Sequence, residues 1–162
     1  MSKSLQELFD TLPQIGRVDW IGIRPERKAP MIVVNAVEAK AGRGLTGDRY
    51  NSNNGKRQIT LIQSEHLFAI GSMLGGITIA PALLRRNIMI SGINLLALKE
   101  KKFMLGNVLL EYTGLCHPCS AMEVTFGAGG YNAIRGHGGI TARILTDGII
   151  YVGDIVKTEI II

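Results

Sequence analysis

Short apolar runs interrupted by glycine limit the possible folds of this chain more than any other feature. The sequence contains 20 glycines, and its apolar runs are short and often β-branched. Glycine permits tight turns, and β-branched residues favour strands. We expect strands over residues 17–24, 31–37, 57–63, 140–145, 149–152 and 155–162, with two strands or one bulged strand over 103–111. This pattern favours a mainly β fold, an irregular barrel or sandwich, with a few short helices.

Helical spacing of apolar residues is confined to short segments. Residues 2–12 and 64–74 repeat apolar side chains every three or four positions, and a serine can cap the start of the second segment. Single helical turns are expected near 81–84 and 131–135. The two apolar runs at the C-terminal end are expected to pair with each other as adjacent strands.

Length, charge and hydropathy argue against several classes of protein. A chain of 162 residues suits one domain. The net charge of +5 is spread along the chain and aromatic residues make up only 6%, which does not match a nucleic-acid-binding surface. Such a modest positive charge suits a small anionic ligand. No apolar run is long enough to span a membrane, and residues 1–10 lack the apolar core of a signal peptide, so we expect a cytoplasmic protein.

Both cysteines lie in one loop, Cys116-His117-Pro118-Cys119. Their spacing is compatible with a redox pair, with a metal half-site that includes His117 or His137, or with one thiolate that ligates a soft metal or carries sulfur. A redox pair of the thioredoxin kind requires a following helix, and the sequence shows no convincing helix after Cys119. Two buried, inert cysteines are a further interpretation, and a structural zinc site would need ligands from elsewhere.

Residues 41–49 form a second candidate site, because glycines and arginines are concentrated there. Glycine lets the backbone approach a ligand closely, and the planar guanidinium matches phosphate and carboxylate oxygens. The loop lacks the Lys-Ser/Thr ending of a P-loop, and a solvated connection is the alternative. Arg85 and Arg86 begin the segment 85–90, whose second half is expected to be a strand. Adjacent residues entering a strand point to opposite faces, so at most one of the two arginines would face a given pocket. His66, near the start of a helix, is interpreted as a surface or packing residue.

In their order and spacing, these motifs resemble the MOSC domain, which is named after the C-terminal part of molybdenum cofactor sulfurases. The matching positions are 42–49, 57–62, 85–88, 92–93 with Leu95, Phe103, Gly106, 113–119, 135–139, Gly148 and 153–154. The resemblance extends from about Gly16 to Val156. It implies a MOSC-type irregular β-barrel over residues 16–162, preceded by an N-terminal helical extension over residues 1–15, in a stand-alone member with a single domain.

The resemblance also implies a pocket for the pterin-based molybdenum cofactor, a small anionic ligand. Cys119 matches the reactive position of the family best, so it is the expected metal ligand and catalytic thiol, with Cys116 as its catalytic helper. The residues expected to bind the cofactor are Arg43, Gly47, Asp48, Arg49, Arg57, Arg86, Asn87, His117, Arg135 and His137. Arginines and backbone donors would meet the phosphate, and a thiolate would meet the soft metal–sulfur centre.

The function implied by this resemblance is to bind the molybdenum cofactor and to handle sulfur or molybdenum through a cysteine. The alternatives are a carrier without turnover and a molybdenum-dependent reductase of N-hydroxylated compounds that acts with partner proteins. If the protein is an enzyme, we expect a sulfur transferase or a component of a molybdenum-dependent oxidoreductase. Pyridoxal phosphate binding occurs in the family through a cysteine desulfurase domain. No segment here resembles that domain, so we expect a separate sulfur-donor or redox partner.

Overall fold

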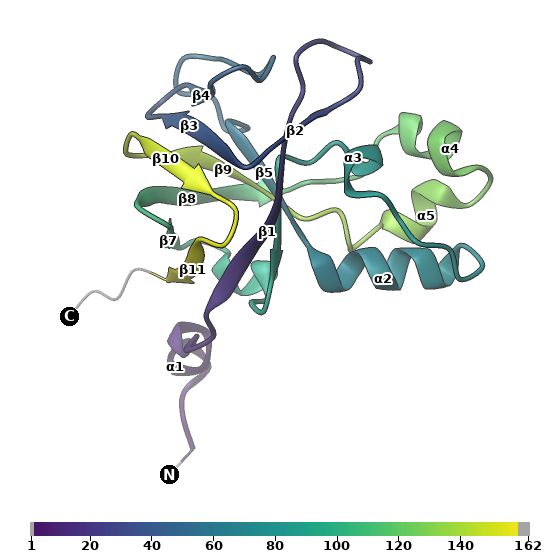
Figure 1. Cartoon of the computed structure of the whole chain (residues 1–162). Helices are drawn as coiled ribbons and strands as arrows, with labels where there is room; N and C mark the ends of the chain where they lie inside the picture. The colour runs from purple at the N-terminus through teal and green to yellow at the C-terminus, as the bar shows by residue number, and fades with distance from the viewer. Residues whose placement is uncertain (1, 159–162) are drawn as a thin grey trace.

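Seven strands of the chain close into a mixed β-barrel (Figure 1). The computed structural model describes residues 2–158. The larger sheet contains β1 (Gly16–Ile23), β2 (Ile32–Val34), β5 (Ile59–Gln63), β6 (Ile88–Ser91), β7 (Lys102–Leu105), β8 (Val108–Leu115), β9 (Ile140–Ile144) and β11 (Ile155–Thr158). Its order is β11-β7-β8-β9-β5-β6-β1-β2, and pairing of β11 with β1 closes the barrel. Only β5 and β6 are parallel neighbours in this sheet. The prediction of a mainly β fold is confirmed.

A smaller sheet lies beside the barrel and contains β3 (Ala36–Lys40), β4 (Gly44–Leu45) and β10 (Gly148–Tyr151), in the order β10-β3-β4. The run predicted as one strand over 31–37 is therefore divided between the two sheets. The expected pairing of the last two strands is wrong, because β10 pairs with β3 whereas β11 pairs with β1 and β7. Gly153, with a φ of 94°, turns the chain between them. The last four residues of the predicted final strand lie outside the described residues.

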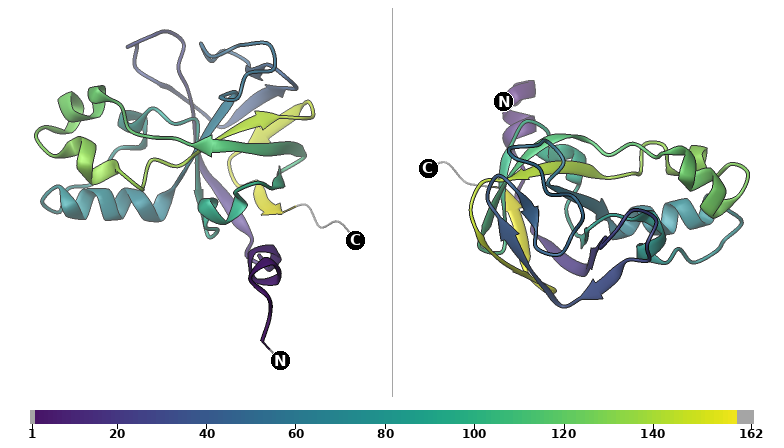
Figure 2. Two further views of the ribbon diagram at one scale, coloured as in Figure 1. Left: turned by 180° about the vertical axis from the view of Figure 1, so that it is seen from behind. Right: turned by 90° about the horizontal axis from the view of Figure 1, so that it is seen from above.

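The described helices are α1 (Leu5–Asp10), α2 (Ser64–Met73), α3 (Pro81–Leu84), the 3₁₀-helix η1 (Leu95–Leu98), α4 (Ser120–Phe126) and α5 (Gly130–Ile134). Helices α2 to α5 gather on one side of the barrel, whereas α1 projects away from it (Figures 1 and 2) and η1 contributes Leu95 and Leu98 to the barrel core. The helix predicted over 64–74 is confirmed, although its N-cap is Gln63 and not the serine. Helix α4 was missed, because Met122 is its one buried residue and a single buried position leaves no apolar periodicity to detect.

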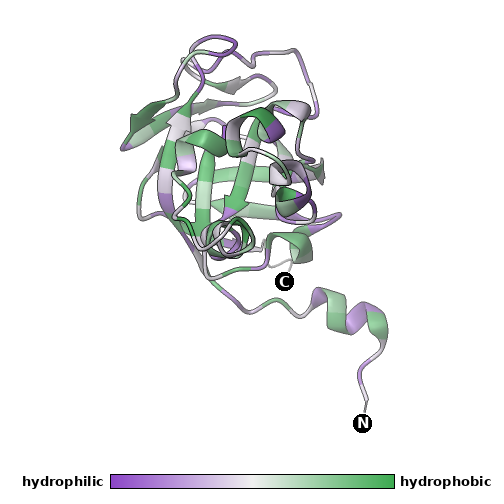
Figure 3. Cartoon of the chain, turned by 90° about the vertical axis from the view of Figure 1, so that its right-hand side faces the viewer, coloured by the Kyte–Doolittle hydropathy of each residue, from purple (hydrophilic) through white to green (hydrophobic). Residues whose placement is uncertain are grey.

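Two apolar clusters form the core. The larger fills the barrel and includes Ile21, Leu61 and Phe103. The smaller packs α2, α3, α4 and α5 against the outside of β5, where Ile62 belongs to it. Every residue of β5 is buried, since one face meets the barrel interior and the other meets the helices. Figure 3 shows the resulting concentration of apolar residues along the barrel strands.

Helix α1 projects away from the barrel (Figure 1) and has no buried residue. The apolar side chains that predicted it are exposed, so tertiary packing does not maintain this helix. A capping box between Ser4 and Glu7 and an ion pair of 2.8 Å between Asp10 and Lys101 hold it instead. Within residues 2–158, no helix has the length and apolar content that crossing a membrane requires. The division of the chain after residue 15 stays a prediction.

Candidate functional site

The loop with the two cysteines is held against a glycine-rich segment that precedes β9. Strands β8 and β9 pair up to Leu115 and Ile140, and the N–H of Cys116 then donates to Gly139 O at 2.8 Å. A Cβ on Gly138 would lie 2.0 Å from Cys116 O, and one on Gly139 would lie 1.9 Å from a carbonyl of β5. Glycines at these two positions therefore permit the close approach of the three segments.

The side chain of Arg86 connects the cysteine loop with the glycine-rich segment that precedes β9. This side chain is buried, and its Nε donates to Gly138 O at 2.9 Å. Its terminal nitrogens donate to the carbonyl oxygens of Leu84 at 2.9 Å, Cys116 at 3.4 Å and His117 at 3.3 Å. In the part of the chain that the structure describes, no carboxylate pairs with this guanidinium. A buried positive charge is thus held only by neutral oxygens.

Burial lowers the pKa of the Arg86 guanidinium. A negative charge on Cys116 or Cys119 would raise it again, whereas the positive charges of Arg57 and Arg24 lower it further. The site therefore favours an anion near the cysteine loop. The prediction that at most one of the adjacent arginines would face inward agrees with this arrangement. Arg85 ends α3 in a left-handed conformation, with φ 58°, and only Arg86 is buried.

Asp48 and Asn87, two of the residues expected to bind the cofactor, belong to a buried network with Arg24 and Thr60. Arg24 donates to the two carboxylate oxygens of Asp48 at 3.2 and 3.0 Å. Asn87 donates to Asp48 at 3.1 Å and accepts from Thr60 at 3.1 Å. Burial by itself raises the pKa of Asp48, but the hydrogen bonds and charge of Arg24 outweigh it and hold this pKa below its usual value. Both predicted residues are thereby engaged within the protein.

Arg24 was missed by sequence reasoning, which treated it only as the end of the first strand. The available signal was an arginine that directly follows the uncharged stretch 20–23 and precedes Pro25. A charged residue that must be buried requires a partner of opposite charge. That partner, Asp48, lies 24 positions away in the glycine–arginine loop, and spacing alone could not identify it.

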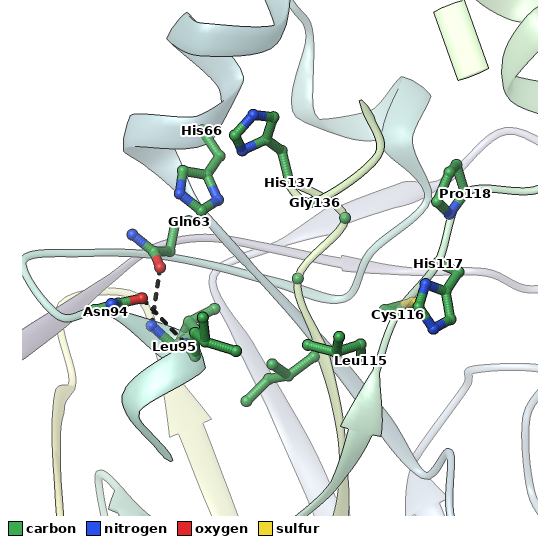
Figure 4. Close-up of a pocket in the computed structure, with 14 residues that line it drawn as sticks. Gln63, His66, Asn94, Leu95, Leu115, Cys116, His117, Pro118, Gly136 and His137 are labelled. Atoms are coloured by element: carbon green, nitrogen blue, oxygen red, sulfur yellow. Dashed lines mark hydrogen bonds between the residues drawn. The ribbon is translucent and has the colours of Figure 1, made fainter. Parts of the chain in front are cut away.

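A cavity of about 410 Å³ opens beside the cysteine loop (Figure 4). Cys116 and His117 line one side, and His66 and His137 lie together on another. The two imidazole rings meet edge to face, with centroids 4.8 Å apart. His66 was interpreted as a surface or packing residue, but the structure places it in this cavity. Burial and then the charge of His137 lower the pKa of His66.

The two cysteines differ in accessibility. Cys116 is buried, with 2% of its surface exposed, whereas Cys119 is exposed directly before α4. Among residues 2–158, no group of three histidine, cysteine or acidic side chains is placed to hold a metal ion. A zinc site made by protein side chains alone is therefore not formed there. A metal held by Cys119 would need further ligands from a bound molecule.

The remaining predicted residues are distributed more widely. Arg43 and Gly47 line a separate hollow of about 250 Å³ that shares no lining residue with the cavity at Cys116. Arg49 is exposed, and its backbone N–H donates to the carbonyl oxygen of Arg24 at 2.6 Å. Arg135 is exposed and donates to a neighbouring asparagine. Thus the structure joins Arg86, Cys116 and His117 directly, but it leaves Arg43 and Arg135 outside this group.

Comparison with known proteins gives one family match. The sequence model of the MOSC domain matches residues 40–157. The YUAD protein from Bacillus subtilis superimposes with a TM-score of 0.77 at 19% identity, over 88% of this chain and 94% of that one. YiiM from Geobacillus stearothermophilus has a TM-score of 0.71 at 16% identity, over 90% and 75% of the two chains. YiiM from Escherichia coli has a TM-score of 0.67 at 15% identity, over 90% and 71%. A search of curated proteins gave no match.

Proposed function

Because the chain belongs to the MOSC domain family, which is associated with the molybdenum cofactor, we propose that it binds this cofactor at the Cys116–Cys119 loop. The family match and the barrel confirm the resemblance that the sequence motifs predicted. In this proposal Cys119 holds molybdenum through its thiolate. The bound cofactor would supply a soft metal–sulfur centre able to exchange electrons or sulfur.

The single observation that carries the proposal is the buried guanidinium of Arg86. A buried charge is costly unless an opposite charge compensates it, and no carboxylate of the described chain does so. Arg57 and Arg24 add further positive charge around Arg86. An anionic ligand next to the cysteine loop would supply the missing negative charge. This requirement fits a phosphate-bearing cofactor whose metal is held by a thiolate.

The other residues of the site have supporting roles in this proposal. Exposed Cys119 can reach a soft metal, whereas Cys116 is buried in the wall of the cavity. Arg86 fixes the cysteine loop by donating to its carbonyl oxygens. Asp48 keeps Arg24 in place, and this role replaces direct ligand binding by Asp48 because its oxygens already accept several hydrogen bonds.

The test is cofactor retention by protein purified under reducing conditions from cells that make the molybdenum cofactor. Molybdenum is measured by mass spectrometry and the pterin by fluorescence after oxidation. We expect Cys119→Ser to lose most of the molybdenum and Cys116→Ala to keep most of it. Arg86→Gln should lose pterin as well as metal, while the matched control Arg17→Gln, on an exposed position of β1, should retain both. Equal molybdenum in Cys119→Ser and the unmodified protein would refute the role of Cys119.

A sulfur carrier that uses the same thiol is the second candidate, and the exposure of Cys119 favours it, because a donor protein must reach the sulfur. Incubation with a cysteine desulfurase and cysteine should then add the mass of one sulfur atom to the protein. This addition should disappear in Cys119→Ser and persist in Cys116→Ala.

A separate assay distinguishes a cofactor carrier from an oxidoreductase. The protein with bound cofactor is mixed with an electron donor, and binding of the cofactor without turnover of the donor would identify a carrier.

A further inference from the structure

The cavity beside Cys116 differs in chemistry from the arginine-rich surroundings of the loop. No acidic or basic side chain other than histidine lines it. Its polar side chains are Gln63, His66, Asn94, His117 and His137. The oxygens of Gln63 and Asn94 already accept backbone N–H groups, at 2.8 and 3.2 Å, so these two amides are left as donors (Figure 4). Apolar side chains and glycines complete the wall.

His137 has hydrogen-bonding capacity that the described part of the chain does not use. The Nδ1 atom of His137 is buried and has no hydrogen-bond partner. A buried polar atom without a partner costs free energy, unless a ligand or an ordered water satisfies it. Glycines at 136, 138 and 139 flank His137, and the last two are clamped against Cys116 and β5, which fixes the segment that carries the ring. The ring of His137 is therefore held in a rigid part of the cavity wall, beside the ring of His66.

The surroundings of His66 disfavour its positively charged form. This residue lies in the first turn of α2, where the helix dipole disfavours a positive charge, and burial and the charge of His137 both lower its pKa. Glu65 on the same helix opposes this shift only as the smallest of the named causes. His117 lines the opposite side, and Arg86 lies behind the wall, bonded to the carbonyl oxygens of the cysteine loop. Above the ordinary histidine pKa of 6.5, His66 is thus an uncharged donor and acceptor.

We propose that this cavity binds a small, planar, uncharged molecule with adjacent hydrogen-bond donor and acceptor groups, and that His66 and His137 recognise it. A volume of about 410 Å³ lies within the range of small-molecule sites. A neutral imidazole offers one donor and one acceptor, which complements an amide-like group. The lining contains no lysine or arginine side chain that could pair with a carboxylate. The inference goes beyond the proposed function, because it concerns a ligand recognised without metal or cofactor.

The test compares two probes of the same shape, benzamide and benzoate, with the full-length protein and no metal. The chain has three histidines, so their Cε1–Hε1 signals can be assigned by single substitutions. At about pH 8, benzamide should shift the signals of His66 and His137 and bind about tenfold more tightly than benzoate. Benzoate should gain affinity as the pH falls, because a protonated imidazole attracts a carboxylate.

Variants identify the residues that make the contacts. His137→Leu should weaken benzamide about tenfold, because leucine cannot form the hydrogen bond, whereas the control Arg17→Gln, on an exposed position of β1, should leave the affinity unchanged. Absence of a shift at all three histidine signals would overturn the proposal without requiring any variant to fold, and a shift confined to His117 would overturn it as well. Tighter binding of benzoate at about pH 8 would also overturn it, since Arg86 would then control the cavity. Because the assay contains no molybdenum, its outcome is independent of the role proposed for Cys119.

Discussion

The ion pair between Arg24 and Asp48 allows a quantitative test of what stabilises the end of the barrel at which β1 ends. The side chains are 6% and 0% exposed, and the shortest contact is 3.0 Å. Removing one partner of a buried pair typically costs about 3–5 kcal/mol, because the other charge is left uncompensated. In Asp48→Asn the new amide oxygen can still accept a hydrogen bond, so we expect the low end, about 3 kcal/mol.

A matched control is provided by Glu111, which pairs with Arg143 at 3.2 Å with side chains 36% and 27% exposed. For such an accessible pair, Glu111→Gln should cost less than about 1 kcal/mol. The measurement is the free energy of unfolding from guanidinium titrations of both variants, with comparison of the m-values. If Asp48→Asn costs no more than Glu111→Gln, the buried pair does not stabilise this end of the barrel and the reasoning fails.

The pH dependence of stability gives a second readout of the same pair. The pKa of Asp48 is lower in the folded state than the ordinary value of 3.8. The unfolded chain therefore takes up the proton first as the pH falls. The stabilisation by this carboxylate is complete above about pH 4 and is lost as the pH falls through the folded-state pKa. Asp48→Asn should lack this part of the acid dependence, whereas Glu111→Gln should retain it.

Two further predictions concern the wall of the cavity. Gly139 and Gly76 have φ values of 86° and 82°, but only Gly139 has a neighbour, Leu61 O, within reach of a Cβ. Gly76→Ala should cost about 1 kcal/mol from the left-handed backbone, and Gly139→Ala at least about 2 kcal/mol more in chemical unfolding. Equal costs would exclude the close approach as their cause. His137→Asn should raise the pKa of His66 towards 6.5 in an NMR titration, and an unchanged value would show that the rings do not interact electrostatically.

The strands could be predicted from the sequence because their signal is local. The β-branched runs at 17–24 and 57–63 correspond to β1 and β5 within two residues. The pairing of the strands was harder to predict. A Gly-Asp turn directs β10 and β11 into different sheets, and the local sequence does not encode the partner of a strand. Helix α4 was missed for a related reason, since it buries a single residue.

For the site, the sequence identified the cysteine loop and Arg86 but not the grouping of the other residues. Arg24 and Asn87 are 63 positions apart, and they meet because β1 and β6 are neighbours in the barrel. The pairing of His66 with His137 depends on packing of α2 against α5, which no spacing in the sequence reveals. Arg43 and Arg86 are both arginines, but Arg43 is exposed and Arg86 is buried, and this difference in burial arises only from the fold.

Arg86 links the two proposed sites. It binds the carbonyl oxygens of Cys116 and Gly138, and these same two residues line the cavity. A ligand that supplies negative charge at the cysteine loop would stabilise the Arg86 charge and so strengthen its hold on both segments. The cavity wall would then become more rigid, and a second ligand would lose less freedom on binding. An anion at the loop and a neutral molecule in the cavity should therefore bind with positive coupling, which Arg86→Gln should remove.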